Sequence, residues 1–151
     1  MMLDKLAELK ATEFHEESKF RSLIARVSNV FFMKPQTFMN QSGVAVSHFV
    51  NYYKVAHRDL YVIHDDLDLN LGEEKVQFAK GPKIHKGVNS IEQHLGDSEF
   101  WRVRLGVDGR KGDEKVAGEE YVLKRFDKRE EKIVNETIVR LSAKLLEDLG
   151  L

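Results

Sequence analysis

The chain has 151 residues, of which 42% are hydrophobic and 32% are charged, which is typical of one globular domain and excludes a disordered or fibrous chain. Its 24 Lys and Arg against 25 Asp and Glu leave a formal charge of minus one, so an anionic partner has to be bound by a local basic patch. The chain contains no cysteine, which excludes a disulfide framework, thiolate catalysis and zinc bound by cysteine.

The sequence also argues against a membrane segment or a secretion signal. No apolar run approaches the roughly 20 residues that span a bilayer. The opening stretch MMLDKLAELK carries acidic residues, whereas a signal peptide needs a basic start and an apolar middle. We therefore expect a cytoplasmic protein with no membrane partner.

The first elements are predicted to be a helix and a hairpin. Leucines recur at helical spacing over residues 3–9 and predict a short amphipathic helix. Two β-prone runs, residues 20–27 and 30–33, are separated by a polar pair that suits a tight turn. Pro35 follows and should end the pairing of the second strand.

The middle of the chain predicts strands alternating with helices. Residues 42–55 carry a helical pattern of apolar side chains. The compact apolar run at 60–63 predicts a buried strand, and residues 74–79 alternate weakly as another strand. Residues 88–95 are predicted to be helical, with a glycine ending the helix, and residues 100–107 form a further strand.

The end of the chain predicts a polar loop and a closing helix. Residues 108–118 are rich in glycine and charge and should form a mobile surface loop, and residues 129–149 carry the apolar spacing of a helix. We find neither repeats nor linkers, so we expect a single domain over residues 1–151. Strands alternating with helices predict an α/β domain with a mixed sheet, since the first hairpin is antiparallel and later strands return through helices.

Three polar clusters fall where strands are predicted to end, the edge at which α/β sheets usually bind ligands. They are Asn40, the acidic group that begins at Asp65, and the loop that holds His85 and Lys86. The acidic group could bind magnesium, could orient a histidine base, or could be an ordinary acidic turn. His85 could act as a base, a metal ligand or a phosphate contact, or could be a solvated loop residue.

Basic residues lie on both sides of this loop. Lys75 precedes it and Lys86 belongs to it, while Arg102 and Arg104 lie on the strand that follows. Together they could form a local face that binds phosphate. A run of charges is also common on a solvated surface that binds nothing.

Five blocks of the sequence carry a family resemblance: KPQTFMNQSG, YVIHDDLDLNLG, IHKGVNSIEQHLG, FWRVRLGV and EEYVLKRF. In this order and spacing the chain resembles the bacterial-type peptidyl-tRNA hydrolase family, from about Leu3 to the C-terminus. The resemblance implies a monomeric three-layer α/β/α enzyme with a mixed, mainly parallel sheet. Its implied activity is cleavage of the ester between a peptide and the terminal ribose of tRNA, which recycles tRNA without a metal or a cofactor.

The resemblance also implies roles for individual residues. Asn40 matches the asparagine that contacts the peptide end of the substrate, and Phe38 and Met39 then line the cleft. Asp65 matches the aspartate that hydrogen-bonds the catalytic histidine and stabilises its charged form. The basic face for tRNA phosphate corresponds to Arg104 and Lys75.

The chain departs from the family pattern in two places. The family normally begins with a strand and a GLGNPG-like loop, followed by a TRHN-like segment that supplies the catalytic histidine. This chain has neither, so the sequence predicts an N-terminally shortened domain. In addition, Lys86 replaces the asparagine of the family's GHNG loop, and an ammonium group donates hydrogen bonds without accepting any.

Three explanations of these departures remain open. The chain could be a truncated form of an active hydrolase. It could be a divergent enzyme in which His85 or His64 replaces the missing base beside Asp65. It could also be an inactive relative that binds tRNA ends or another RNA through its basic residues, which are Lys75, Lys86, Arg102 and Arg104.

The missing strand has a structural consequence as well. A sheet without a central strand exposes two strand edges, which is a liability for a folded domain. We therefore expect either a sheet that has rearranged and closed up, or a dimer that forms through the exposed edge.

Overall fold

The computed structural model describes residues 1–110 and 125–151. The predicted loop at 108–118 and the last of the five family blocks therefore lie largely outside the described residues. In the described part no helix is long and apolar enough to cross a membrane.

The elements follow the order predicted from the sequence. The helices are α1 (Met2–Leu9), α2 (Ser42–Tyr53), α3 (Lys86–Leu95) and α5 (Lys128–Asp148). The strands are β1 (His15–Glu17), β2 (Ser22–Val27), β3 (Val30–Pro35), β4 (Tyr61–Asn70), β5 (Glu74–Phe78) and β6 (Trp101–Asp108). Short 3-10 turns occur at η1 (Ser18–Phe20), η2 (Met39–Gln41) and η3 (His57–Asp59).

The strands form two separate sheets. One has the order β1-β2-β3 with antiparallel pairing throughout. The other has the order β4-β6-β5, in which β4 and β6 are parallel and β5 is antiparallel to β6. This confirms an α/β fold with mixed pairing. The sheet is not mainly parallel, however, since β4 and β6 form the only parallel pair in the described residues.

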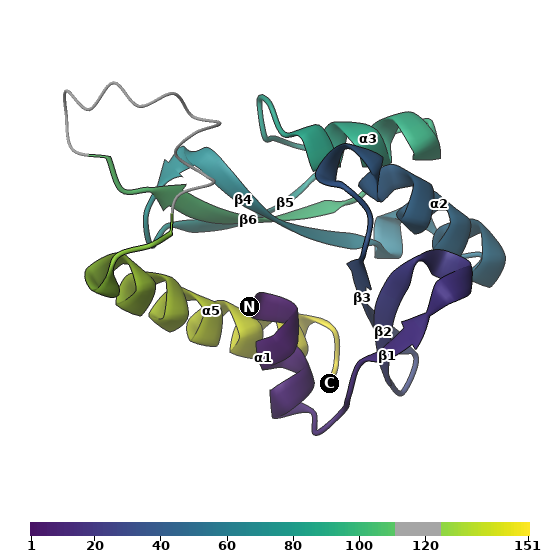
Figure 1. Cartoon of the computed structure of the whole chain (residues 1–151), viewed down its shortest axis with the longest axis horizontal. Helices are drawn as coiled ribbons and strands as arrows, with labels where there is room; N and C mark the ends of the chain where they lie inside the picture. The colour runs from purple at the N-terminus through teal and green to yellow at the C-terminus, as the bar shows by residue number, and fades with distance from the viewer. Residues whose placement is uncertain (111–124) are drawn as a thin grey trace.

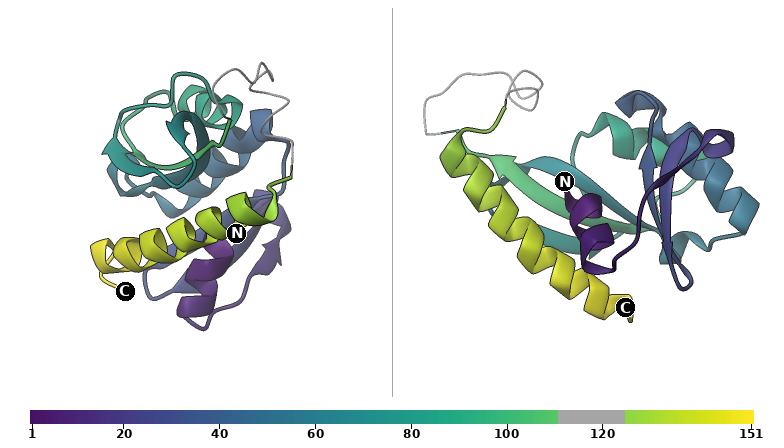
Figure 2. Two further views of the ribbon diagram at one scale, coloured as in Figure 1. Left: turned by 90° about the vertical axis from the view of Figure 1, so that its left-hand side faces the viewer. Right: turned by 60° about the horizontal axis from the view of Figure 1, so that its bottom comes forward.

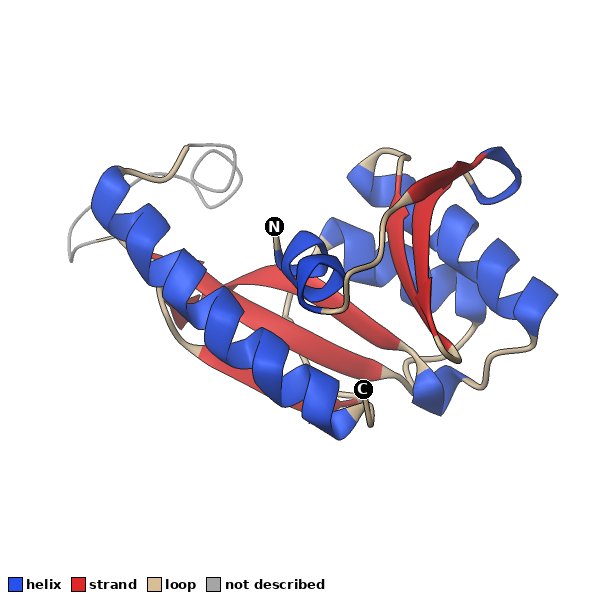
Figure 3. Cartoon of the chain, turned by 90° about the horizontal axis from the view of Figure 1, so that it is seen from below, coloured by secondary structure: helices blue, strands red, loops and turns tan. Residues whose placement is uncertain are grey.

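Helices cover the β4-β6-β5 sheet on both faces (Figure 1), as a three-layer arrangement requires. On one face α1 packs beside α5 (Figure 2), and the core there includes Leu6, Val103 and Leu141. On the other face α2 and α3 pack on a second cluster around Val88 and Phe100. The strands of the two sheets run in different directions (Figure 3), and the described residues do not form one closed sheet. The alternative expectation, a dimer through the exposed edge, stays a prediction.

Strand β4 is longer than the apolar run that predicted it. It continues beyond Ile63 through the acidic group and pairs with β6 at Asp65 and Asp66. The acidic group therefore lies within a strand rather than in a turn after one. A strand tolerates these charges because successive side chains point to opposite faces, which gives Asp65 and Asp66 different partners.

Candidate active site

Asp65 and His85 form the polar centre of the site. His85 immediately precedes α3, and its Nε2 lies 3.1 Å from Oδ1 of Asp65 on β4. Its Nδ1 accepts hydrogen bonds from the backbone N–H groups of Gly87 and Val88, at 3.1 and 3.2 Å. A nitrogen that accepts carries no proton, so Nε2 holds the proton of neutral His85 and donates it to Asp65.

This hydrogen bond favours the charged form of Asp65. Donation by the His85 ring lowers the pKa of the Asp65 carboxyl below its usual range, against the opposing effect of burial. Asp65 is therefore a carboxylate at neutral pH. His85 both caps α3 and fixes the orientation of this carboxylate, and its side chain is only 12% exposed.

A second histidine, His64, lies next to His85. Its ring centroid lies 4.9 Å from that of His85, and its Nδ1 donates to the backbone oxygen of Asp65 at 2.7 Å. Its Nε2 is buried and has no hydrogen-bond partner in the part of the chain that the structure describes. Burial lowers the pKa of His64, so its ring is neutral at pH 7 and Nε2 keeps an unpaired acceptor.

The segment of Asn40 reaches the site through a close contact between η2 and α3. A methyl group added at Gly87 would lie 2.7 Å from the sulfur of Met39, so the two segments approach closely here and a larger residue would require the Met39 side chain to shift. Phe38 and Met39 are 78% and 56% exposed, and the side chain of Asn40 is exposed beside them. These three residues form an open lip, and Met39 brings it against the start of α3.

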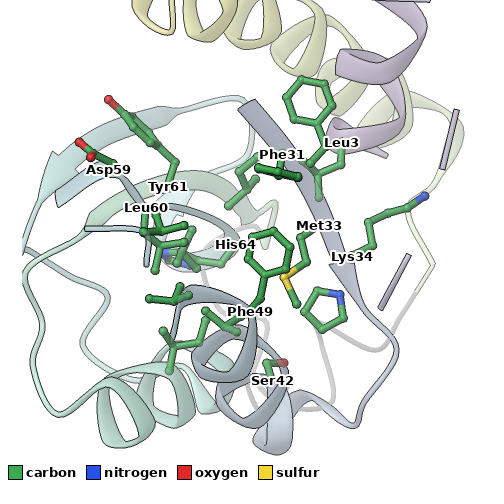
Figure 4. Close-up of a pocket in the computed structure, with 18 of the residues that line it drawn as sticks. Leu3, Phe31, Met33, Lys34, Ser42, Phe49, Asp59, Leu60, Tyr61 and His64 are labelled. Atoms are coloured by element: carbon green, nitrogen blue, oxygen red, sulfur yellow. The ribbon is translucent and has the colours of Figure 1, made fainter. Parts of the chain in front are cut away.

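A cavity of about 890 Å³ extends from this lip between the two sheets. Met39, His64 and His85 line it near the site. Further in, the lining is mostly apolar, and Figure 4 shows Phe31 and Met33 on one side with Leu60 and Tyr61 on the other. Neither Asp65 nor Asn40 lines the cavity.

The two arginines predicted to bind phosphate are buried instead. Arg104 is 7% exposed, and its guanidinium donates to Asp66 at 2.6 Å and to Gln77 at 2.7 Å. Arg102 is 1% exposed and donates to Glu92 and to two backbone oxygens. Their guanidinium groups are committed to acceptors within the protein, so the structure corrects the prediction that they bind tRNA phosphate.

The remaining basic residues lie at the surface. Lys75 is exposed on β5, and Lys86 is exposed at the first position of α3. Residues 1–110 and 125–151 contain no group of His, Asp or Glu side chains that could hold a metal ion. From the sequence, His64 was considered only as a possible base, and Asp66 only as a member of the acidic group. Its buried pairing with Arg104 was not predicted.

Comparison with known proteins identifies the family. The family model described as peptidyl-tRNA hydrolase matches residues 1–149. A peptidyl-tRNA hydrolase of Azoarcus sp. is 33% identical over 142 residues, covering 93% of this chain and 64% of the relative. One from Nitrosomonas europaea is 37% identical over 140 residues, covering 90% of this chain and 71% of the relative.

A solved structure agrees with these relatives. The crystal structure of the peptidyl-tRNA hydrolase from Acinetobacter baumannii superposes with a TM-score of 0.84 at 26% identity. The match covers 95% of this chain and 74% of that one. The chain thus spans about two thirds to three quarters of the length of these proteins and shares their fold. On both sequence and structure, the chain belongs to the peptidyl-tRNA hydrolase family.

Proposed function

We propose that the chain hydrolyses peptidyl-tRNA in the cytoplasm, at the site formed by Asp65, His85 and Asn40. The observation that carries this proposal is the hydrogen bond of 3.1 Å between Nε2 of His85 and the carboxylate of Asp65, in a chain whose relatives are named peptidyl-tRNA hydrolases. A carboxylate that orients an imidazole is the arrangement by which a protein stabilises a histidine that takes a proton from water.

In the proposed reaction water attacks the ester carbonyl, and the ester bond to the ribose oxygen breaks. His85 takes the proton of the water and returns it to the leaving ribose oxygen. Because Nε2 already carries a proton, the new proton has to be taken up at Nδ1, which breaks the two cap hydrogen bonds to α3. Losing an N-cap costs about 0.5–2 kcal/mol, and the carboxylate of Asp65 opposes this cost by stabilising the imidazolium.

The substrate is proposed to lie across the exposed lip beside His85. Phe38 and Met39 present apolar surface to the peptide, and the amide of Asn40 can hydrogen-bond its backbone. Lys75 and Lys86 are proposed to attract the phosphates of the tRNA end.

The test is release of the peptide from N-acetylated peptidyl-tRNA by wild-type protein and by Asp65→Asn. Asp68→Asn is the matched control, since Asp68 is an exposed aspartate on the same strand. We expect turnover by the wild type and by Asp68→Asn, and a loss of at least a hundredfold in Asp65→Asn. Equal rates for all three proteins would reject the assigned site.

One observation favours a second function, that of an inactive relative that binds tRNA. Both ring nitrogens of His85 are engaged in hydrogen bonds, so neutral His85 has no free nitrogen with which to accept a proton. A binding protein would show no turnover, together with tRNA affinity that falls as salt rises. Removing one phosphate-binding lysine, by Lys75→Ala or Lys86→Ala, should then lower the slope of log affinity against log salt by about 0.7–0.9.

A further inference from the structure

The loop that ends at His85 follows a constrained course. Between β5 and α3 it includes Ala79 and Gly81, with φ of 52° and 70°, in the left-handed region that residues with a side chain rarely adopt. The N–H of Ala79 donates to the backbone oxygen of Phe100 at 3.0 Å, which fixes the start of the loop beside β6. A backbone conformation of this kind persists only where the surrounding structure enforces it. Contacts along the loop therefore hold it in place.

One of these contacts is the guanidinium group of Arg104 on β6, which lies against Gly81. A methyl group added at Gly81 would lie 2.7 Å from Cζ, 2.8 Å from Nη1 and 3.0 Å from Nε of Arg104. These three nearest atoms all belong to one flat group. The backbone of the loop is therefore in direct contact with the guanidinium, and a side chain at position 81 would have to displace one or the other.

The guanidinium of Arg104 is itself fixed in place. Its Nε donates to Oδ2 of Asp66 at 2.6 Å, and its Nη1 donates to Oε1 of Gln77 at 2.7 Å. The side chain of Asp66 is only 1% exposed, and a buried carboxylate that loses its partner is strongly destabilising. The guanidinium therefore does not move aside easily. We call Arg104, Asp66 and Gln77 together the platform.

The platform adjoins the candidate active site along two routes. Along the chain, the loop that contacts Arg104 at Gly81 ends at His85, whose Nε2 lies 3.1 Å from Asp65. Across the sheet, Arg104 is the register partner of His64 on β4, and the ring of His64 lies 4.9 Å from that of His85. A shift of the loop relative to the sheet would therefore change how His85 meets Asp65.

We propose that Arg104 is a positioning residue, which sets the course of residues 79–85 and thereby the placement of His85 opposite Asp65. The inference rests on the proposed function, because this placement affects a reaction only if His85 and Asp65 act in it. A misplacement of about 1 Å can cost roughly a hundredfold in rate. Arg104 acts through the loop, since its hydrogen bonds are to Asp66 and Gln77.

Nuclear magnetic resonance of the histidine ring nitrogens tests the placement without any need for turnover. In the wild type the bond to Asp65 keeps the proton of His85 on Nε2, so we expect one tautomer and slow exchange of this proton with water. Gly81→Ala should displace the loop and give a mixture of two tautomers with faster exchange. The spectrum of His85→Asn identifies which signals belong to His85.

Gly96→Ala and Gly150→Ala are the matched controls. Both glycines are left-handed, with φ of 80° and 68°, but a methyl group at either would have no atom within 4 Å. They therefore reproduce the backbone strain of Gly81→Ala without its contact. We expect the His85 signals of both controls to match those of the wild type. Signals of Gly81→Ala that also match the wild type would overturn the proposal.

Hydrolysis of peptidyl-tRNA measures the effect on the reaction. We expect Gly81→Ala to lower kcat by at least about tenfold and to leave KM within about twofold of the wild type, because the loop shift affects the reacting groups more than substrate binding. The two control variants should keep the wild-type kcat. A wild type without turnover whose His85 signals still respond to Gly81→Ala would reject the proposed function and support the positioning of His85 by the platform.

Arg104→Lys shows whether the effect passes through the guanidinium. Lysine keeps a positive charge opposite Asp66 but lacks the flat group, so this variant alone should lower kcat and give mixed tautomers of His85. It also removes the atoms that a methyl group at Gly81 would meet. Adding Gly81→Ala to Arg104→Lys should then lower kcat by no more than about twofold. Losses that multiply in the double variant would overturn the proposal.

Discussion

Replacing His85 by asparagine separates the two roles of its ring in this structure. The ring caps α3 by accepting from Gly87 and Val88, and it is proposed to take a proton in the reaction. Asparagine is a favoured N-cap residue, so His85→Asn can keep the cap, but a carboxamide does not take up a proton at neutral pH. His85→Ala loses both.

The two roles predict effects of different size on folding free energy and on the rate of hydrolysis. Losing the cap costs about 0.5–2 kcal/mol of folding free energy, so His85→Ala should be destabilised by this amount and His85→Asn by much less. A general base contributes about 10²–10⁴-fold to the rate, so both variants should lose about that factor in peptidyl-tRNA hydrolysis.

Urea unfolding and single-turnover release of peptide measure the two effects separately. His94→Asn is the matched control, since His94 is an exposed histidine on the same helix, and it should change neither rate nor stability appreciably. If His85→Asn hydrolysed peptidyl-tRNA at the wild-type rate while His85→Ala did not, His85 would be a positioning residue and its role as base would be refuted.

Three further predictions concern stability. The pKa of His64 is lower folded than unfolded, so the unfolded state binds more protons. Stability should therefore fall below about pH 6.5 by at most about 1.4 kcal/mol per pH unit, a loss that urea unfolding at pH 7.5 and 5.5 should detect and that His64→Phe should abolish. Arg104→Met leaves the carboxylate of Asp66 buried without its partner, and thermal and urea unfolding should show a loss of about 3–5 kcal/mol. A methyl group at Gly43 would lie 2.0 Å from the backbone oxygen of Ser90, so Gly43→Ala should destabilise the fold by about 1–3 kcal/mol or more, whereas Ser47→Ala on the same helix should leave the unfolding midpoint nearly unchanged.

The sequence predicted the order of the elements well, because their signals are local. Helix α3 ends at a glycine in the left-handed conformation, Gly96 with φ of 80°, which the sequence marked as its end. The hairpin of β2 and β3 and the strand that begins at Tyr61 were likewise expected from apolar runs and turn residues.

The partners of charged residues were not predictable in the same way. In the sequence, Arg104 cannot be distinguished from an ordinary surface cation. Its partner Asp66 becomes apparent only when β6 is placed beside β4. The His85 ring hydrogen-bonds both Asp65 and the backbone at the start of α3, which requires β4 and α3 to lie close together. Such pairs join residues far apart in the sequence, and one sequence does not specify them.

The most direct test of the proposed site is a double-mutant cycle on the rate of peptidyl-tRNA hydrolysis, with Asp65→Asn, His85→Ala and the two together. Residues that act as one unit show losses that are far from additive. The account predicts that each single variant loses at least a hundredfold and that the double variant loses little more than the worse single one. Independent losses that multiply in the double variant, or single variants as active as the wild type, would contradict it.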